Sequence, residues 1–179
     1  MSSKYLLSLD GGGVREIATV IFLSKLEKEI GKPLFEQFDF FVGTSAGAIT
    51  AMAISVAKMS GEGLMNLWSE KNLERILEAS MWDSRLGLMQ TNPKYDGAGK
   101  RDVLGEYFGN LKLGEAYKKV AVMSYDIEKR EPILLTSYDD PNISLVDAGS
   151  ATSAAPIYYP TAKVGDRYLI DGGIVANNR

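Results

Sequence analysis

Two stretches near the start of the chain repeat one pattern, in which a short apolar run leads into glycines and then into apolar residues at helical spacing. Residues 5–9 form the first apolar run and end at a glycine triplet. Apolar residues then recur every three or four positions over 17–30, which predicts a helix that stops at a following glycine and proline. Residues 38–42, the glycine-flanked segment 43–47 and the amphipathic pattern of 49–56 repeat the order. Alternating strands and helices predict an α/β layer fold with a mostly parallel central sheet.

The pattern becomes less regular after residue 56. Apolar spacing over 64–77 predicts one or two amphipathic helices, whereas the stretch 80–100, with its Gly, Asn and Pro residues, has the composition of a long loop or lid. Further along, the sequence predicts a short helix, two strands, a helix capped by Ser144 and a final strand pair that leads into Asp171. In chain order their ranges are 103–108, 119–125, 133–136, 145–155, 161–164 and 167–170.

Length and composition indicate one globular domain over residues 1–179, since 45% of the residues are apolar and 24% are charged. The net charge is only -3, and Lys and Arg are scattered among Asp and Glu, so we expect no nucleic acid partner. The chain contains no cysteine and no histidine, which argues against a disulfide framework and a zinc site. Because the carboxylates also lack calcium-loop spacing, we expect neither a metal nor a cofactor.

The sequence predicts a cytoplasmic protein, because it lacks the apolar core of a signal peptide and any apolar segment long enough to span a bilayer. Apolar residues nevertheless gather within the expected loop. They have two interpretations: core packing beneath the loop, which is the more frequent role of such residues, and peripheral contact with a lipid interface. The members of this cluster are Met81, Trp82, Leu86, Leu88 and Met89.

Ser45 is the candidate nucleophile. It lies in Gly43-Thr44-Ser45-Ala46-Gly47, a GxSxG pattern between a predicted strand and a predicted helix. A sharp turn at this point lifts the hydroxyl out of the sheet, and the flanking glycines permit the strained backbone that such a turn needs. A chance match is the alternative, and the position of the pattern between strand and helix argues against it.

A serine nucleophile normally relies on a histidine base, which this chain lacks, so a carboxylate has to accept the proton. Asp171 is the candidate, because it follows an apolar strand and precedes two glycines that allow close approach to the serine. Asp126 is a rival that also follows a predicted strand, and Asp10 is a weaker one. Since a carboxylate has an ordinary pKa of about 3.9, this chemistry requires a partly buried base.

The glycine triplet in Asp10-Gly11-Gly12-Gly13-Val14-Arg15 suits an anion. A dinucleotide phosphate is one option, but the third glycine of the usual fingerprint is replaced by Glu16. The amides of Gly11, Gly12 and Gly13 fit an oxyanion hole better, and a simple tight turn with a solvated Arg15 is the remaining alternative.

Four motifs in this order, Asp-Gly-Gly-Gly-Val-Arg, Gly-Thr-Ser-Ala-Gly, Ala-Thr-Ser-Ala-Ala-Pro and Asp-Gly-Gly, make the chain similar to the patatin-like phospholipases over almost its whole length. The resemblance implies a three-layer α/β/α fold and hydrolysis of phospholipid or lysophospholipid esters. On the matching positions it implies Ser45 as nucleophile, Asp171 as general base and the Gly11–Gly13 amides as oxyanion hole, with Arg15 supporting that loop.

Two positions depart from the family pattern. Glu16 stands where the family commonly has glycine, and Arg179 stands where proline often follows Asn-Asn. Family members usually continue beyond this point, so a fragment of a longer protein is one interpretation. The departures also keep open a catalytically silent relative that binds acyl lipid or a protein partner, while a nucleotide-binding α/β domain is the weakest alternative.

Overall fold

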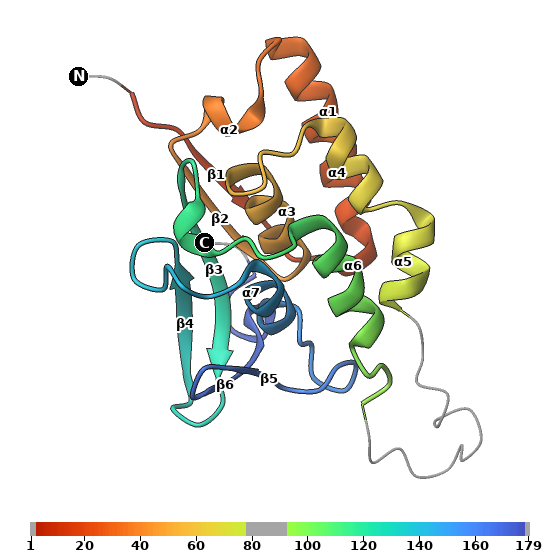
Figure 1. The fold of residues 1–179 in the computed structure, drawn as a ribbon, viewed down its shortest axis with the longest axis vertical. Coiled ribbons are helices and arrows are strands. Elements are labelled where there is room, and N and C mark those ends of the chain that lie inside the picture. Colours follow the sequence, from red (N-terminus) through yellow and green to blue (C-terminus); the bar gives the residue numbers. More distant parts are fainter. Residues whose placement is uncertain (1–2, 78–92, 178–179) are drawn as a thin grey trace.

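The computed structural model describes residues 3–77 and 93–177, which form a six-stranded sheet covered by helices (Figure 1). The strands are β1 (Leu6–Leu9), β2 (Phe40–Thr44), β3 (Lys119–Asp126), β4 (Glu131–Thr136), β5 (Ala162–Val164) and β6 (Arg167–Asp171). The helices are α1 (Glu16–Ile30), α2 (Leu34–Gln37), α3 (Ala46–Ser55), α4 (Gly61–Leu67), α5 (Glu70–Ile76), α6 (Ala98–Phe108) and α7 (Leu145–Thr152).

The sheet is mixed, which corrects the expectation of a mostly parallel one. β1, β2 and β3 are parallel neighbours, whereas β4 and β6 pair antiparallel with β3, and β5 pairs antiparallel with β6. For the β3–β4 and β5–β6 pairs the reason is the length of the connections. Residues 127–130 join β3 to β4 and residues 165–166 join β5 to β6, and links this short allow only antiparallel hairpins.

β2 and β6 pair with consecutive parts of the same edge of β3, and this arrangement brings their ends together. Thr44, the last residue of β2, pairs with Met123, and Asp171, the last residue of β6, pairs with the next residue, Ser124. β4 pairs with Ala121 to Asp126 and therefore occupies the opposite edge of β3. Consequently the ends of β2 and β6 meet at one point, although they are far apart in the chain.

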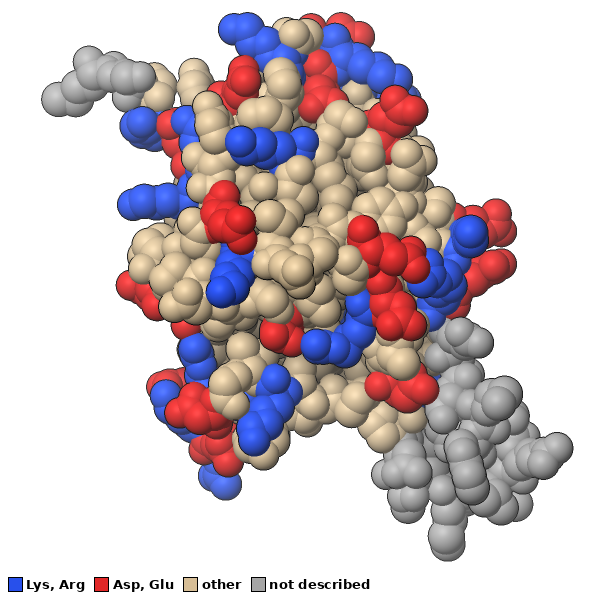
Figure 2. Space-filling view, in the orientation of Figure 1, with Lys and Arg blue, Asp and Glu red and all other residues tan. Residues whose placement is uncertain are grey.

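Helices lie on both sides of the sheet, in the predicted three-layer α/β/α arrangement. α3 packs on β1, β2 and β3, α7 packs on β3, β5 and β6, and these two helices contact each other. α6 packs on α7 and α5 packs on α6, so that this side of the molecule extends outward from the sheet (Figure 1). Figure 2 shows acidic and basic side chains interspersed over the same view, without an extended basic stripe.

The predicted helices and strands occur with two informative differences. All ten residues of α3 are buried, so this helix is not the amphipathic element that its spacing suggested. Its small residues let it sit between the sheet and the surrounding helices. α6 begins at Ala98, five residues before the predicted start, and this extra turn brings Lys100 into the core.

Candidate active site

Ser45 forms the turn between β2 and α3, and its backbone is strained. Its φ of 53° and ψ of -124° are unfavourable for a residue with a side chain. The turn is tight because α3 passes directly over the end of β1: a Cβ on Gly47 would collide with the carbonyl oxygens of Leu9 and Asp10. The sequence pattern thus produces the sharp strand-to-helix turn that it predicts.

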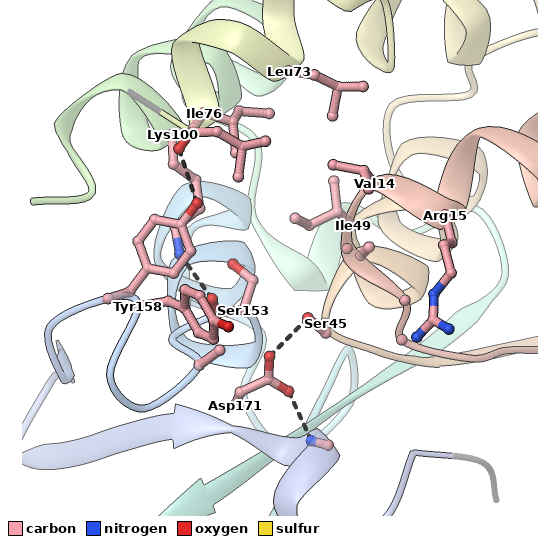
Figure 3. Close-up of a pocket in the computed structure, with 18 of the residues that line it drawn as sticks. Val14, Arg15, Ser45, Ile49, Leu73, Ile76, Lys100, Ser153, Tyr158 and Asp171 are labelled. Carbon is pink, nitrogen blue, oxygen red and sulfur yellow. Dashed lines mark hydrogen bonds between the residues drawn. The ribbon is translucent and has the colours of Figure 1, made fainter. Parts of the chain in front are cut away.

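Asp171 meets Ser45 at the end of β6. The Ser45 hydroxyl donates a hydrogen bond to Asp171 Oδ2 at 2.8 Å, and the amide of Gly173 donates to Oδ1 at 2.7 Å (Figure 3). Only 7% of Asp171 is exposed. Burial raises the pKa of its carboxyl, whereas the Gly173 and Ser45 hydrogen bonds and the Lys100 charge act in the opposite direction. This net rise is the change in basicity that the sequence analysis required.

The glycine triplet lies beside Ser45. A Cβ on Gly11 would come within 3.0 Å of Ser45 Cβ, and the Gly11 carbonyl accepts a hydrogen bond from Asn177 Nδ2 at 3.0 Å. Gly12 and Gly13 continue this loop along the wall of the cavity that contains Ser45. The Arg15 side chain folds back toward Gly12, with its Nε 4.0 Å from the place of a Cβ there.

A cavity of about 620 Å³ opens over the Ser45–Asp171 pair. Its volume falls within the range of about 300–1,000 Å³ typical of small-molecule sites. In Figure 3 the two polar side chains point toward each other, and apolar side chains from α3 and α5 gather on the other side of Ser45. The apolar part of the lining includes Val14, Ile49, Leu67, Trp68, Leu73, Ile76 and Leu104.

Thr152 is a site residue that the sequence analysis did not single out. Its Oγ1 accepts a hydrogen bond from the Ser45 amide at 2.9 Å and donates one to the Met123 carbonyl. It belongs to the Ala-Thr-Ser-Ala-Ala-Pro motif, so the signal was present in the sequence. The motif contains two polar side chains, Thr152 and Ser153. The packing of α7 on β3 turns Thr152 toward Ser45.

Lys100 was also missed, because it lies in a stretch that reads as loop. Its Nζ donates to the Ser153 carbonyl at 3.0 Å and lies 3.6 Å from the centroid of the Tyr159 ring. The side chain lines the cavity, and its residue is only 4% exposed. Burial lowers the pKa of Lys100 to about 7, opposed by the charge of Asp171.

Glu16, the first departure from the family pattern, is a buried acid at the start of α1. It is 1% exposed, and its Oε1 has no hydrogen-bond partner among the described residues. Burial raises its pKa to about 7, against a hydrogen bond to Thr50 and together with the charge of Asp10. Glu16 is not among the residues that line the cavity.

The other candidates lie elsewhere. Asp126 is buried at the β3–β4 turn, where its Oδ1 accepts hydrogen bonds from the amides of Glu128 and Lys129, so it has a structural role there. The apolar cluster of the expected loop and the second family departure, Arg179, fall outside the described residues.

The chain is a three-layer α/β/α domain in which a serine and an aspartate at adjoining strand ends form a hydrogen bond. Residues 7–179 match the family model of patatin-like phospholipase, and the chain belongs to that family.

Individual relatives agree with this assignment. The chain is 32% identical to patatin-like protein 4 of Arabidopsis thaliana, over 97% of this chain and 49% of the relative, and 31% identical to the cGAMP-activated phospholipase of Pseudomonas aeruginosa, over 97% and 53%. It thus spans about half the length of these curated relatives. The crystal structure of VipD from Legionella pneumophila matches 99% of this chain and 47% of that one with a TM-score of 0.69; at 16% identity this likeness shows the fold.

Within residues 3–77 and 93–177, no helix is both long enough and apolar enough to cross a bilayer.

Proposed function

We propose that this chain is the catalytic domain of a serine hydrolase that cleaves the acyl ester bonds of phospholipids or lysophospholipids. The observation that carries the proposal is the 2.8 Å hydrogen bond from the Ser45 hydroxyl to Asp171 Oδ2. Membership of the patatin-like phospholipase family supports a lipid ester as the substrate class. The raised pKa of Asp171 supports its use as a base.

The first half of the reaction forms an acyl-enzyme. Ser45 Oγ attacks the ester carbonyl while its proton passes to Asp171 Oδ2, and the amides of the glycine loop stabilise the negative oxygen of the tetrahedral intermediate. When the intermediate collapses, the bond to the alcohol portion breaks. That alcohol leaves with the proton from Asp171.

The second half releases the fatty acid. Water attacks the acyl carbonyl and gives its proton to Asp171, a second tetrahedral intermediate forms, and its collapse returns the proton to Ser45. The one carboxylate therefore serves as base and as acid in each half. Hydrogen bonds from Ser45 and Gly173 hold the two oxygens of the Asp171 carboxylate, and this fixed orientation suits a group that alternates between base and acid.

The apolar part of the cavity provides room for the acyl chain. Its lining residues come from α3, α4, α5 and α6, and each methylene that leaves water contributes about 0.8 kcal/mol to binding. A chain held there has its carbonyl end at Ser45. The head group then lies toward the exposed part of the lining, which includes Gly13 to Arg15 of the glycine loop, Pro156 and Tyr158.

The test is fatty-acid release from mixed phospholipid and lysophospholipid vesicles. We expect the parent protein to release fatty acid and both Ser45→Ala and Asp171→Asn to reduce the rate by at least about a thousandfold. Two matched controls remove the same kinds of group elsewhere: Ser153→Ala deletes another hydroxyl of the cavity lining, and Asp126→Asn neutralises the rival carboxylate at the β3–β4 turn. Release that survives Asp171→Asn and disappears in Asp126→Asn would reassign the base.

The catalytically silent alternative has its own outcome in this assay. Such a protein binds the vesicles and releases nothing. Since one relative is named a cGAMP-activated phospholipase, the assay is run with and without cGAMP before that outcome is accepted. Release in either condition contradicts the silent alternative.

A further inference from the structure

We propose that the rim of the cavity docks onto phospholipid bilayers containing anionic lipid, with Ile157 as the side chain that enters the membrane. The rim consists of three exposed segments, residues 13–15, 156–158 and 173–175. The proposal rests on the function proposed above for its biological meaning, while its test measures membrane binding alone. It names a surface outside the apolar cluster of residues 81–89.

The rim is largely apolar and almost without charge. All nine residues of the three segments are exposed, and seven of them also line the cavity. Five carry large apolar or aromatic side chains, and the only charged residue among the nine is a cation, Arg15. Contiguous exposed apolar surface around a binding cavity marks an interaction site. The five large side chains are Val14, Ile157, Tyr158, Ile174 and Val175.

Ile157 is the clearest member of this surface. It is 78% exposed, more than any other large apolar residue described, and its φ is +75°. A β-branched residue is strained in this left-handed region, where glycine is at ease. Two backbone hydrogen bonds fix the segment, from the Lys94 amide to the Ile157 carbonyl at 2.9 Å and from the Tyr95 amide to the Tyr158 carbonyl at 2.8 Å.

The backbone strain and the exposure of Ile157 both indicate a role outside folding. A side chain that is out of the core adds little to folding, and here the loop also holds it in a backbone conformation that is unfavourable for a β-branched residue. Strained residues of this kind occur where function requires them. An apolar side chain held out from the protein by a fixed loop has the geometry of a membrane anchor.

The surroundings of Ile157 are those of a membrane interface. The rings of Tyr95 and Tyr158 stack at 6.3 Å, and Lys94 Nζ lies 5.3 and 6.0 Å from their centroids. Tyrosines favour the head-group level of a bilayer, and lysine extends its ammonium toward lipid phosphates.

Charge complementarity selects an anionic surface. The rim and residues 94–96 carry two cations, Lys94 and Arg15, against one acid, Asp96, whose Oδ1 accepts a hydrogen bond from the amide of Ala98 at 2.8 Å. A cation near an anionic bilayer gains about 1 kcal/mol. Docking by this rim would bring the cavity mouth against the bilayer, so that an acyl chain enters it without crossing water.

The test is sedimentation with large vesicles of phosphatidylcholine, with and without phosphatidylglycerol, using the whole chain with Ser45→Ala so that no lipid is consumed. We expect binding that increases with phosphatidylglycerol and falls at least tenfold in Ile157→Asp. Ile127→Asp, a matched change of an exposed isoleucine at the β3–β4 turn, should bind like the parent. A parent protein that stays in solution with both vesicles, or equal loss in the two variants, overturns the proposal.

Ile157→Gly separates membrane binding from folding. This change relieves the strain, so the melting temperature should rise while vesicle binding still falls. A rise in melting temperature with full binding would contradict the anchor role.

Activity assays then distinguish this proposal from the catalytic one. In the Ser45-containing protein, Ile157→Asp should lower the ratio of vesicle lipid hydrolysis to hydrolysis of soluble p-nitrophenyl butyrate. Vesicle binding without hydrolysis of either substrate refutes the catalytic proposal alone, whereas hydrolysis of the soluble ester without vesicle binding refutes the docking surface alone.

Discussion

Thr152 Oγ1 accepts the hydrogen bond of the Ser45 amide at 2.9 Å, so α7 fixes the backbone of the strained turn on which the candidate nucleophile lies. Thr152 is fully buried, and its hydroxyl also donates to the Met123 carbonyl of β3. Thr152 therefore links Ser45 both to α7 and to the central strand β3.

Removing the Thr152 hydroxyl should affect both stability and turnover. Thr152→Val leaves the Ser45 amide without its acceptor, which costs about 1–3 kcal/mol of unfolding free energy. Displacement of Ser45 should lower kcat roughly tenfold, because small misplacements of reacting groups are costly. Urea denaturation and steady-state kinetics measure the two effects. Thr152→Ser keeps the hydroxyl and should restore most of both; a kcat unchanged in Thr152→Val would show that the hydrogen bond does not position the serine.

Lys100 should set the pH range of activity. Its positive charge lowers the pKa of Asp171, so Lys100→Met should raise that pKa and keep the base protonated up to higher pH. We therefore expect the acid limb of the kcat/KM profile to move to higher pH. Lys129→Met, which removes an exposed lysine at the β3–β4 turn, is the control. An acid limb at the same pH in Lys100→Met would exclude the electrostatic role, even if the overall rate fell.

Glu16 should make the fold less stable as the pH rises. Its pKa is about 7 in the folded protein and 4.5 ordinarily, so between these values the folded state binds a proton that the unfolded state has released. The free energy of unfolding should accordingly fall from pH 4.5 to pH 7, by about 3 kcal/mol from this group. Chemical denaturation across this range should show a flatter curve for Glu16→Gln than for the parent or for exposed Glu36→Gln. Parallel curves for all three would refute the assignment.

Gly47 should tolerate no side chain. A Cβ there would lie 2.6 Å from the Asp10 carbonyl oxygen and closer still to that of Leu9, so Gly47→Ala should destabilise the protein by about 1–3 kcal/mol and lower activity. Gly105, inside α6 with open space around it, is the matched position. Gly105→Ala should stabilise by about 0.5–1 kcal/mol through helix propensity. Thermal melts of the two variants that shift in the same direction would contradict this difference.

Local sequence patterns predicted the elements well where one periodicity dominated. The strands around residues 5–9 and 38–42 and the helix over 17–30 occur within one or two residues of their expected bounds. The same reasoning erred over α3, because apolar spacing alone does not tell a helix buried on every side from an amphipathic one. It also missed the antiparallel pairs of the sheet, of which β3–β4 and β5–β6 follow from short connections.

The candidate site was predictable in its motifs and not in its supporting contacts. Ser45 and Asp171 each stand beside glycines at the end of an apolar strand, and the structure places them within hydrogen-bonding distance. Their catalytic roles remain predictions. Thr152 and Lys100 depend on how α7 and α6 pack against the sheet, and no local spacing determines such contacts between distant segments.

The shared edge of β3 has a consequence for the order in which the candidate site is completed during synthesis. Ser45 is synthesised 126 residues before Asp171, a delay of roughly 6 to 25 s at ordinary rates of translation. During that time the serine has no Asp171 to accept its proton, and β6 has not yet taken its place beside Ser124. The strand order thus makes the Ser45–Asp171 hydrogen bond one of the last contacts of the site to form, since it requires β6.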